Sequence, residues 1–143
     1  MKTIGWILAA GLAASAAPAL AGDLTVTLEG VSDQGGEMLV SLQTRELFMK
    51  PAGVNGAYGA ATAGTDTFTL HNVEPGEYAV VVMHDANSDR QMQFGPDGKP
   101  AEGWAMSGDR PAAGKPTFDQ ARVVVPAEGG QVTLRMVYPQ GGR

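Results

Sequence analysis

Cysteine is absent from this sequence, and only two of its 143 residues are histidine. The lack of thiols excludes disulfide bonds, haem-attachment motifs and the Cys/His clusters that hold structural zinc. Basic residues are also few: ten Lys and Arg stand against fifteen Asp and Glu, which gives a formal net charge of −5. Because the basic residues form no cluster, the sequence argues against nucleic acid or an anionic membrane surface as a partner. Because no disulfide bond can form, core packing or a bound ion must stabilise the chain.

A long apolar run occurs only at the N-terminus. Lys2 precedes an apolar stretch over residues 4–12, and Ala19-Leu20-Ala21 has the small-x-small pattern of a signal-peptide cleavage site. The stretch is too short for a good membrane span. We therefore predict a signal peptide over residues 1–21 and, after cleavage, a single domain over residues 22–143. This domain is expected to be periplasmic or secreted, without a stable membrane anchor.

Elsewhere, apolar and polar residues alternate with the period of a half-buried β-strand, first at Leu24, Val26 and Leu28. The predicted strands cover residues 24–29, 37–44, 66–71, 78–83, 122–125 and 132–138, with a seventh near residues 53–61. We expect the first two strands to form a hairpin. The most apolar run, at residues 78–83, is expected to be a central strand with both faces buried. No later segment predicts a helix. The sequence thus predicts an all-β fold, an antiparallel β-sandwich of six to seven strands.

The segment between residues 85 and 120 has no sustained period and predicts one long loop. Its aromatic residues argue for order, because aromatic side chains can hold a loop against a core. Long ordered loops in small domains are commonly functional, so we predict that this loop forms the working surface. The candidate surface residues are His84, Trp104, Ser107, Phe118 and Asp119.

Oxygen-bearing side chains follow the most apolar strand at alternate positions, at Asp85, Asn87 and Asp89. This spacing lets a tight loop direct three oxygens at one cation, and such ligands suit calcium. In a regular loop beginning at Asp85, a glycine and a closing carboxylate would stand where this chain has Arg90 and Pro96. Arg90 would need a left-handed conformation and would bring a positive charge beside the cation. We therefore expect a mainly structural turn with at most weak calcium affinity. Water or a remote carboxylate could complete the shell, the candidates being Asp97, Asp109 and Asp119.

No catalytic motif is evident, so the sequence predicts a protein that is not an enzyme. Ser107, His84 and Asp119 can be written as a hydrolytic triad, but Ser107 lacks the Gly-x-Ser-x-Gly context. With no thiol and no third histidine, a zinc or copper site is hard to assemble, and the methionines around His84 follow no known copper spacing. His84 is instead expected to hydrogen-bond a neighbouring loop backbone.

Several segments resemble a known family. They are the opening strand at residues 24–31, Pro75-Gly76-Glu77-Tyr78-Ala79-Val80 leading to His84-Asp85-x-Asn87, the pair Trp104 and Ser107, and Pro116-Thr117-Phe118-Asp119-Gln120-Ala121. In these segments the chain resembles DUF2141, a bacterial exported family of unknown function. The resemblance implies a sandwich similar to prealbumin-like or carboxypeptidase regulatory-like (Ig-like) domains, and it implies no activity. Family members often have a glycine at the position of Arg90 and an aspartate at that of Gln93, so this chain departs from the pattern there.

Three functional hypotheses follow. The preferred one is an exported, non-enzymatic module that binds an unknown protein or small-molecule partner. The alternative is a calcium-stabilised adhesion or carbohydrate-associated domain, with Ca²⁺ as the one candidate cofactor. The third is a small hydrolase that uses His84 and Asp85.

Overall fold

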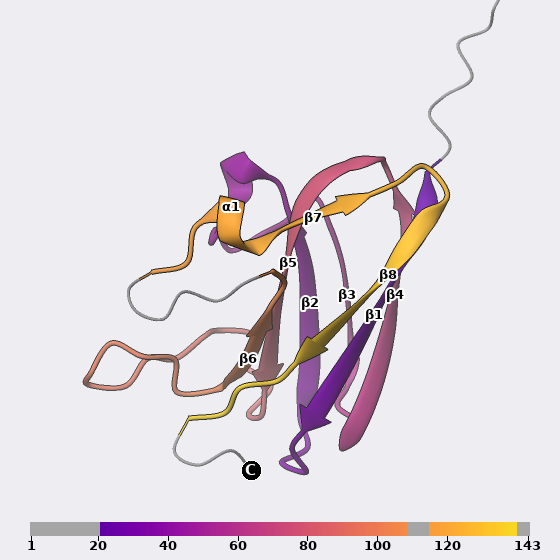
Figure 1. Cartoon of the computed structure of the whole chain (residues 1–143). Coiled ribbons are helices and arrows are strands. Elements are labelled where there is room, and N and C mark those ends of the chain that lie inside the picture. The colour runs from indigo at the N-terminus through magenta and orange to yellow at the C-terminus, as the bar shows by residue number, and fades with distance from the viewer. Residues whose placement is uncertain (1–20, 109–114, 140–143) are drawn as a thin grey trace, which may run out of the picture.

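The computed structural model describes residues 21–108 and 115–139 (Figure 1). Within them, the chain forms eight strands and two very short helices. In chain order these are β1 (Gly22–Val31), β2 (Glu37–Gln43), η1 (Arg45–Leu47), β3 (Asn55–Ala60), β4 (Gly64–Val73), β5 (Gly76–Asp85), β6 (Gly103–Met106), α1 (Phe118–Ala121), β7 (Arg122–Val125) and β8 (Gly129–Arg135). The prediction of an all-β fold is confirmed. Residues 1–20 of the predicted signal peptide lie outside the described residues.

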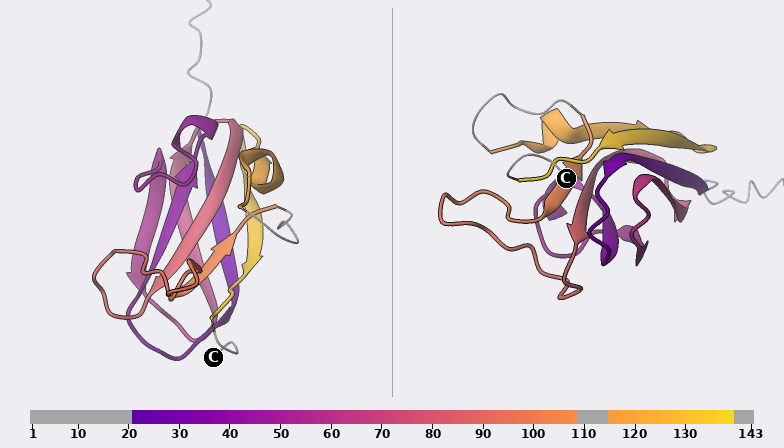
Figure 2. Two further views of the ribbon diagram at one scale, coloured as in Figure 1. Left: turned by 90° about the vertical axis from the view of Figure 1, so that its left-hand side faces the viewer. Right: turned by 90° about the horizontal axis from the view of Figure 1, so that it is seen from below.

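Two sheets pack face to face in a sandwich-like arrangement (Figure 2). One sheet has the order β4-β1-β8, and the other has the order β3-β2-β5-β6, with β7 also paired to β5. Apolar side chains from both sheets form the main core between them, because alternate residues of each strand point inward. A second, smaller apolar cluster consists of Ala79, Met106, Phe118 and Ala121. The core residues with the least exposure include Val26, Leu28, Met38, Leu42, Leu70, Val80 and Val82.

The strand at the centre of the second sheet is β5, as predicted. It pairs with β2 on one side, and with β7 and then β6 along the other. Tyr78, Val80 and Val82 face the core and are buried. Val81 and Met83 on the outer face are only half-buried, so the expectation that both faces are fully buried was wrong for this face.

Three other expectations need correction. The first two strands do not form a hairpin, because β1 pairs with β4 and β8, while β2 pairs with β3 and β5. The sheets are not wholly antiparallel, since β1 and β8 run parallel. The segment predicted as one long loop contains a strand that was not predicted, β6. It ends in the helix α1, whose N-terminus has a capping box formed by Thr117 and Gln120.

After β8 the chain crosses from one sheet to the other. Met136 still donates its backbone N–H to Glu29 of β1, at 2.9 Å. Val137 then exchanges backbone hydrogen bonds with Trp104 of β6, at 2.7 and 2.9 Å. This crossing brings Tyr138 next to the end of β5, where the candidate site residues lie.

Candidate functional site

The histidine at the end of β5 is fully buried and hydrogen-bonded through both ring nitrogens. His84 Nε2 lies 2.7 Å from the carbonyl oxygen of Gly35, and Nδ1 lies 2.7 Å from the hydroxyl of Tyr138. Because a carbonyl only accepts, Nε2 carries the proton and Tyr138 donates to Nδ1. The Tyr138 hydroxyl in turn accepts from the backbone N–H of Ser32, at 2.9 Å. The predicted bond to a loop backbone is confirmed, and His84 joins the β1–β2 connection to the C-terminal segment.

Ser107 is also buried, and its hydroxyl takes the place of a neighbouring strand's backbone carbonyl as hydrogen-bond acceptor for β5. The oxygen accepts from the backbone N–H of Val80 at 2.8 Å, and the hydroxyl donates to the carbonyl of Ala121 at 2.6 Å. Ser107 therefore fills the interval between β6 and β7 on the edge of β5. With both hydrogen-bonding roles used, and with no His84 contact among its described hydrogen bonds, Ser107 has no geometry for a nucleophile.

The other candidate surface residues divide between interior and exterior. Phe118 of α1 is buried and packs edge-to-face against Phe48, with ring centroids 5.9 Å apart. Trp104 on β6 is half-buried, and Asp119 is exposed, paired with Arg45 at 2.6 Å. That pair lowers the pKa of Asp119. His84, Ser107 and Phe118 thus lie inside the protein rather than on a loop surface.

The three predicted calcium ligands lie in one turn at the end of β5. The Asp85 carboxylate is buried and accepts the backbone N–H groups of Asp89 at 3.2 Å and Arg90 at 2.5 Å. Asp89 is exposed and accepts side-chain amide hydrogens from Asn87, at 3.3 Å, and from Gln93. The Asp85 side chain therefore stabilises the turn through backbone hydrogen bonds, while the expectation of weak calcium affinity stays a prediction.

Glu102 is the site residue that sequence reasoning missed. It immediately precedes β6, and the register of β5 with β6 ends at His84 opposite Gly103, so Glu102 stands beside Asp85. Carboxylate oxygens of Asp85, Asp89 and Glu102 all lie within 4.8 Å of one another. Glu102 is 9% exposed, and its Oε2 is buried with no hydrogen-bond partner in the described structure. Burial and the charges of Asp85 and Asp89 raise the pKa of Glu102.

A row of large apolar side chains crosses the outer face of the second sheet. Tyr58, Leu39, Met83 and Trp104 stand opposite one another on four neighbouring strands. Tyr58 is 65% exposed, and the other three are half-buried. At one end of the row, the guanidinium of Arg90 lies 4.5 Å from the centre of the Tyr58 ring. We call these four residues the apolar row.

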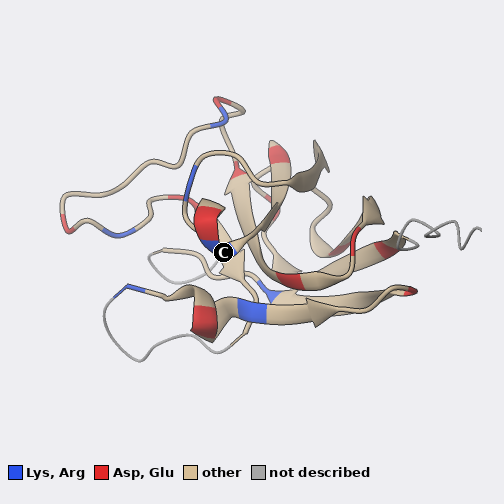
Figure 3. Ribbon diagram, turned by 90° about the horizontal axis from the view of Figure 1, so that it is seen from above, with Lys and Arg blue, Asp and Glu red and all other residues tan. Residues whose placement is uncertain are grey.

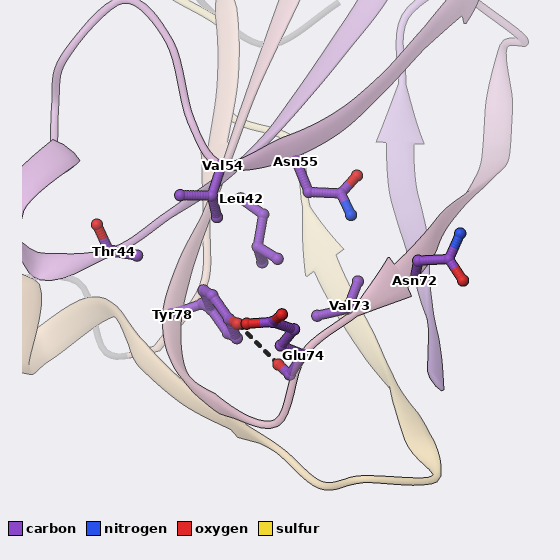
Figure 4. Close-up of a pocket in the computed structure, with 8 residues that line it drawn as sticks. All are labelled: Leu42, Thr44, Val54, Asn55, Asn72, Val73, Glu74 and Tyr78. Atoms are coloured by element: carbon purple, nitrogen blue, oxygen red, sulfur yellow. Dashed lines mark hydrogen bonds between the residues drawn. The ribbon is translucent and has the colours of Figure 1, made fainter. Parts of the chain in front are cut away.

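Among the surface hollows formed by the described residues are two whose linings do not include the buried His84. One, of about 380 Å³, lies at the opposite end of the sandwich (Figure 4) and is lined by Leu42, Thr44, Val54, Asn55, Asn72, Val73, Glu74 and Tyr78. In it, the Tyr78 hydroxyl donates to the carbonyl of Glu74 at 2.7 Å. The other, of about 620 Å³, separates the loop after β5 from the C-terminal segment and includes Pro96, Lys99, Tyr138 and Pro139 in its lining.

Charged residues are spread over both sheets and the loops (Figure 3). The second histidine, His71, lies on the surface, 3.2 Å from the carboxylate of Asp23. Within the described residues, no helix is both long enough and apolar enough to cross a membrane.

Comparison with known proteins identified one family. The family model described as "Uncharacterized protein conserved in bacteria (DUF2141)" matches residues 26–133, which is most of the chain. Curated proteins and solved structures gave no match.

Proposed function

The chain belongs to the DUF2141 family, and we propose that it is an exported, non-enzymatic module that binds a protein partner through the outer face of the β3-β2-β5-β6 sheet. The apolar row forms the centre of the binding face, and residues 86–102 form its rim. The sandwich belongs, in this proposal, to the prealbumin-like or carboxypeptidase regulatory-like class.

The observation that carries the proposal is the apolar row itself. Neighbouring strands are about 5 Å apart, so four strands extend the row over roughly 15 Å. Aromatic residues and methionine are enriched at the centres of protein interfaces, whereas small-molecule sites are mostly concave. Tyr58 is 65% exposed although its ring is large and apolar. Exposed aromatic side chains of this kind are typical of surfaces that bind another protein.

The rim is formed by the loop that follows β5, which extends away from the sandwich (Figures 1 and 2). Its outer part is a small hairpin in which Gly95 and Ala101 donate backbone N–H groups to Lys99 and Gln93, at 2.8 and 2.7 Å. Phe94, at the base of this hairpin, is 62% exposed. An aromatic side chain on a projecting loop adds apolar area beside the row without contributing to the core.

A non-enzymatic role is supported by the hydrogen bonds of the two candidate catalytic groups. His84 and Ser107 are buried, and each uses its polar atoms to join segments of the fold. A hydrolase would need one of these groups to face a substrate. Export is supported by the pattern Ala19-Leu20-Ala21, and mass spectrometry of the exported protein should find Gly22 at its N-terminus.

The test is covalent capture of partners from a periplasmic extract with the full chain and matched variants. Tyr58→Ser should remove most of the captured protein, because it removes the most exposed ring of the row. Val124→Ser is the control, since Val124 is 70% exposed but lies opposite Glu77, near the other end of β5. Both variants should melt at nearly the wild-type temperature, as exposed substitutions usually do.

Two outcomes would contradict the proposal. One is a captured protein that Tyr58→Ser and Val124→Ser retain equally well. The other is hydrolytic activity of the purified protein that His84→Gln abolishes while the fold remains intact.

A further inference from the structure

We propose that Asp85, Asp89 and Glu102 bind a calcium ion at the junction of β5 and β6. This inference goes beyond the proposed partner binding, and it does not depend on it. Asn87, which lies in the same turn, would add an amide oxygen. The site would connect the loop after β5 to the strand that ends it.

The first argument is the unsatisfied oxygen Oε2 of the Glu102 carboxylate. Buried carboxylates in folded proteins are paired, hydrogen-bonded or bound to a metal, because burying an unpaired charge is costly. Glu102 Oε2 has no partner in the described structure, and a carboxylate oxygen of Glu102 lies within 4.8 Å of carboxylate oxygens of Asp85 and Asp89. Three acidic groups within 4.8 Å of one another repel unless a cation or a proton lies between them. A divalent cation would satisfy the free oxygen and remove the repulsion in one step.

The second argument is the shape of the turn. In calcium loops, oxygens at the first, third and fifth positions converge while the sixth residue makes a sharp turn that favours glycine. Here Asp85, Asn87 and Asp89 hold those positions, and Arg90 has a φ of 58°. Arg90 thus adopts the left-handed conformation that is unfavourable for a residue other than glycine. The backbone N–H of Arg90 donates to the Asp85 carboxylate.

The positive charge of Arg90 is directed away from the cluster. Its guanidinium contacts the carboxylate of Glu37 at 3.3 Å and covers the ring of Tyr58. The charge of Arg90 is therefore already paired with a carboxylate outside the cluster. The expected repulsion between Arg90 and a bound cation is therefore reduced.

The ligand chemistry favours calcium over other metals. All the available donors are oxygens, which suits hard cations, whereas zinc and copper prefer nitrogen or sulfur. His84, the nearest imidazole in the sequence, has both nitrogens occupied. Glu102 supplies the carboxylate that is missing at Pro96, and the exposed side of Asp89 leaves room for the waters that complete a shell of six to eight oxygens.

The experiment is calcium titration of the chelator-treated full chain, followed by calorimetry and thermal melting. Calcium should bind and raise the melting temperature by several degrees, because a ligand that binds only the folded state stabilises it. Glu102→Gln and Asp89→Asn should each weaken calcium affinity at least about tenfold, as expected for the loss of a charged ligand. Asp97→Asn is the control. Asp97 was a candidate ligand from the sequence, but the structure does not place it in the cluster of Asp85, Asp89 and Glu102, and it accepts from the backbone of Lys99.

The effect of Glu102→Gln on the melting temperature should also change sign between calcium-free and calcium-containing buffer. A purely structural turn would not produce this reversal. Without calcium, this variant should melt at or above the wild-type temperature, because it removes a buried charge that lies beside those of Asp85 and Asp89. With calcium, it should melt below the wild type. Asp89→Asn, at an exposed position, tests the site should Glu102→Gln fail to fold.

The inference would be overturned by a wild-type protein that shows no heat and no shift at about 10 mM calcium, about ten times the weakest dissociation constant usual for extracellular calcium modules. A shift that Glu102→Gln and Asp89→Asn retain in full would overturn it too, and an equal shift with magnesium would overturn the choice of metal. Tyr58→Ser should keep the calcium shift, so loss of partner capture and loss of calcium binding can be told apart.

Discussion

Ser107 joins β6 to the end of α1, because its hydroxyl donates to the carbonyl oxygen of Ala121 at 2.6 Å. The same oxygen accepts the backbone N–H of Val80, at 2.8 Å. We predict that Ser107→Ala lowers the free energy of unfolding by about 2–3 kcal/mol, since it leaves a buried donor and a buried acceptor unpaired. Urea denaturation measures the loss.

Ser32→Ala is the matched control for this prediction. Ser32 is 7% exposed, and its hydroxyl oxygen has no hydrogen-bond partner in the described structure. Removing this oxygen should change the free energy of unfolding by less than about 1 kcal/mol, or should stabilise the protein. Equal losses in the two variants would show that the bonds of Ser107 contribute nothing specific.

Tyr138→Phe should destabilise the protein by about 1–3 kcal/mol while keeping the ring in place. The hydroxyl that it removes donates to His84 Nδ1 and accepts from the backbone of Ser32. Tyr58→Phe removes an exposed hydroxyl and should change stability by no more than about 0.5 kcal/mol. Chemical denaturation of both variants decides the matter, and a harmless Tyr138→Phe would mean that the network does not hold the C-terminal segment.

Gly108→Ala should be far more harmful than Gly98→Ala. Both glycines have a φ of 76°, so alanine costs each about 1–2 kcal/mol in backbone strain. A Cβ on Gly108 would lie 1.9 Å from the carbonyl oxygen of Gln120, whereas a Cβ on Gly98 would meet nothing within 4 Å. The difference in unfolding free energy should therefore exceed about 2 kcal/mol. Similar melting temperatures for the two variants would contradict the close contact of residue 108 with α1.

Without calcium, the protein should become less stable as the pH rises above 4.5, the ordinary pKa of a glutamate. Burial first, and then the charges of Asp85 and Asp89, raise the pKa of Glu102 in the folded state. Between the unfolded and folded pKa values the folded state holds more protons, so stability is full below that window and is lost as the pH rises through it.

This pH effect is measured by urea denaturation in chelator from about pH 4 to about pH 8. Glu102→Gln should flatten the decline, because glutamine does not titrate. Calcium should oppose the decline, because the metal binds the ionised carboxylates. A wild-type decline that Glu102→Gln leaves unchanged would assign the effect to another group.

Local patterns in the sequence predicted much of the strand content. The strand predicted at residues 122–125 coincides with β7, and the most apolar run lies within β5. By contrast, β8 ends at Arg135, earlier than the predicted 138, because residues 136–138 leave β1 and join β6. Periodicity cannot show this exchange of partners, since the apolar alternation continues through it.

The strand β6 was missed because it is short and because its pairing partner, β5, is distant in the sequence. Gly103–Met106 contains too few residues to show a period, yet its pairing with β5 sets Glu102 beside Asp85. The short apolar stretch around Trp104 was the one signal of a strand there.

The sequence by itself determined the all-β class, the central strand and the turn at Asp85, because strand alternation and turn chemistry depend on neighbouring residues. Only the tertiary structure decided that β1 and β2 belong to different sheets, that His84 and Ser107 lie inside the protein, and that Glu102 lies beside Asp85 and Asp89. Each of these depends on the register between segments that are distant in the chain. That register is set by the packing of the whole core, which no local pattern encodes.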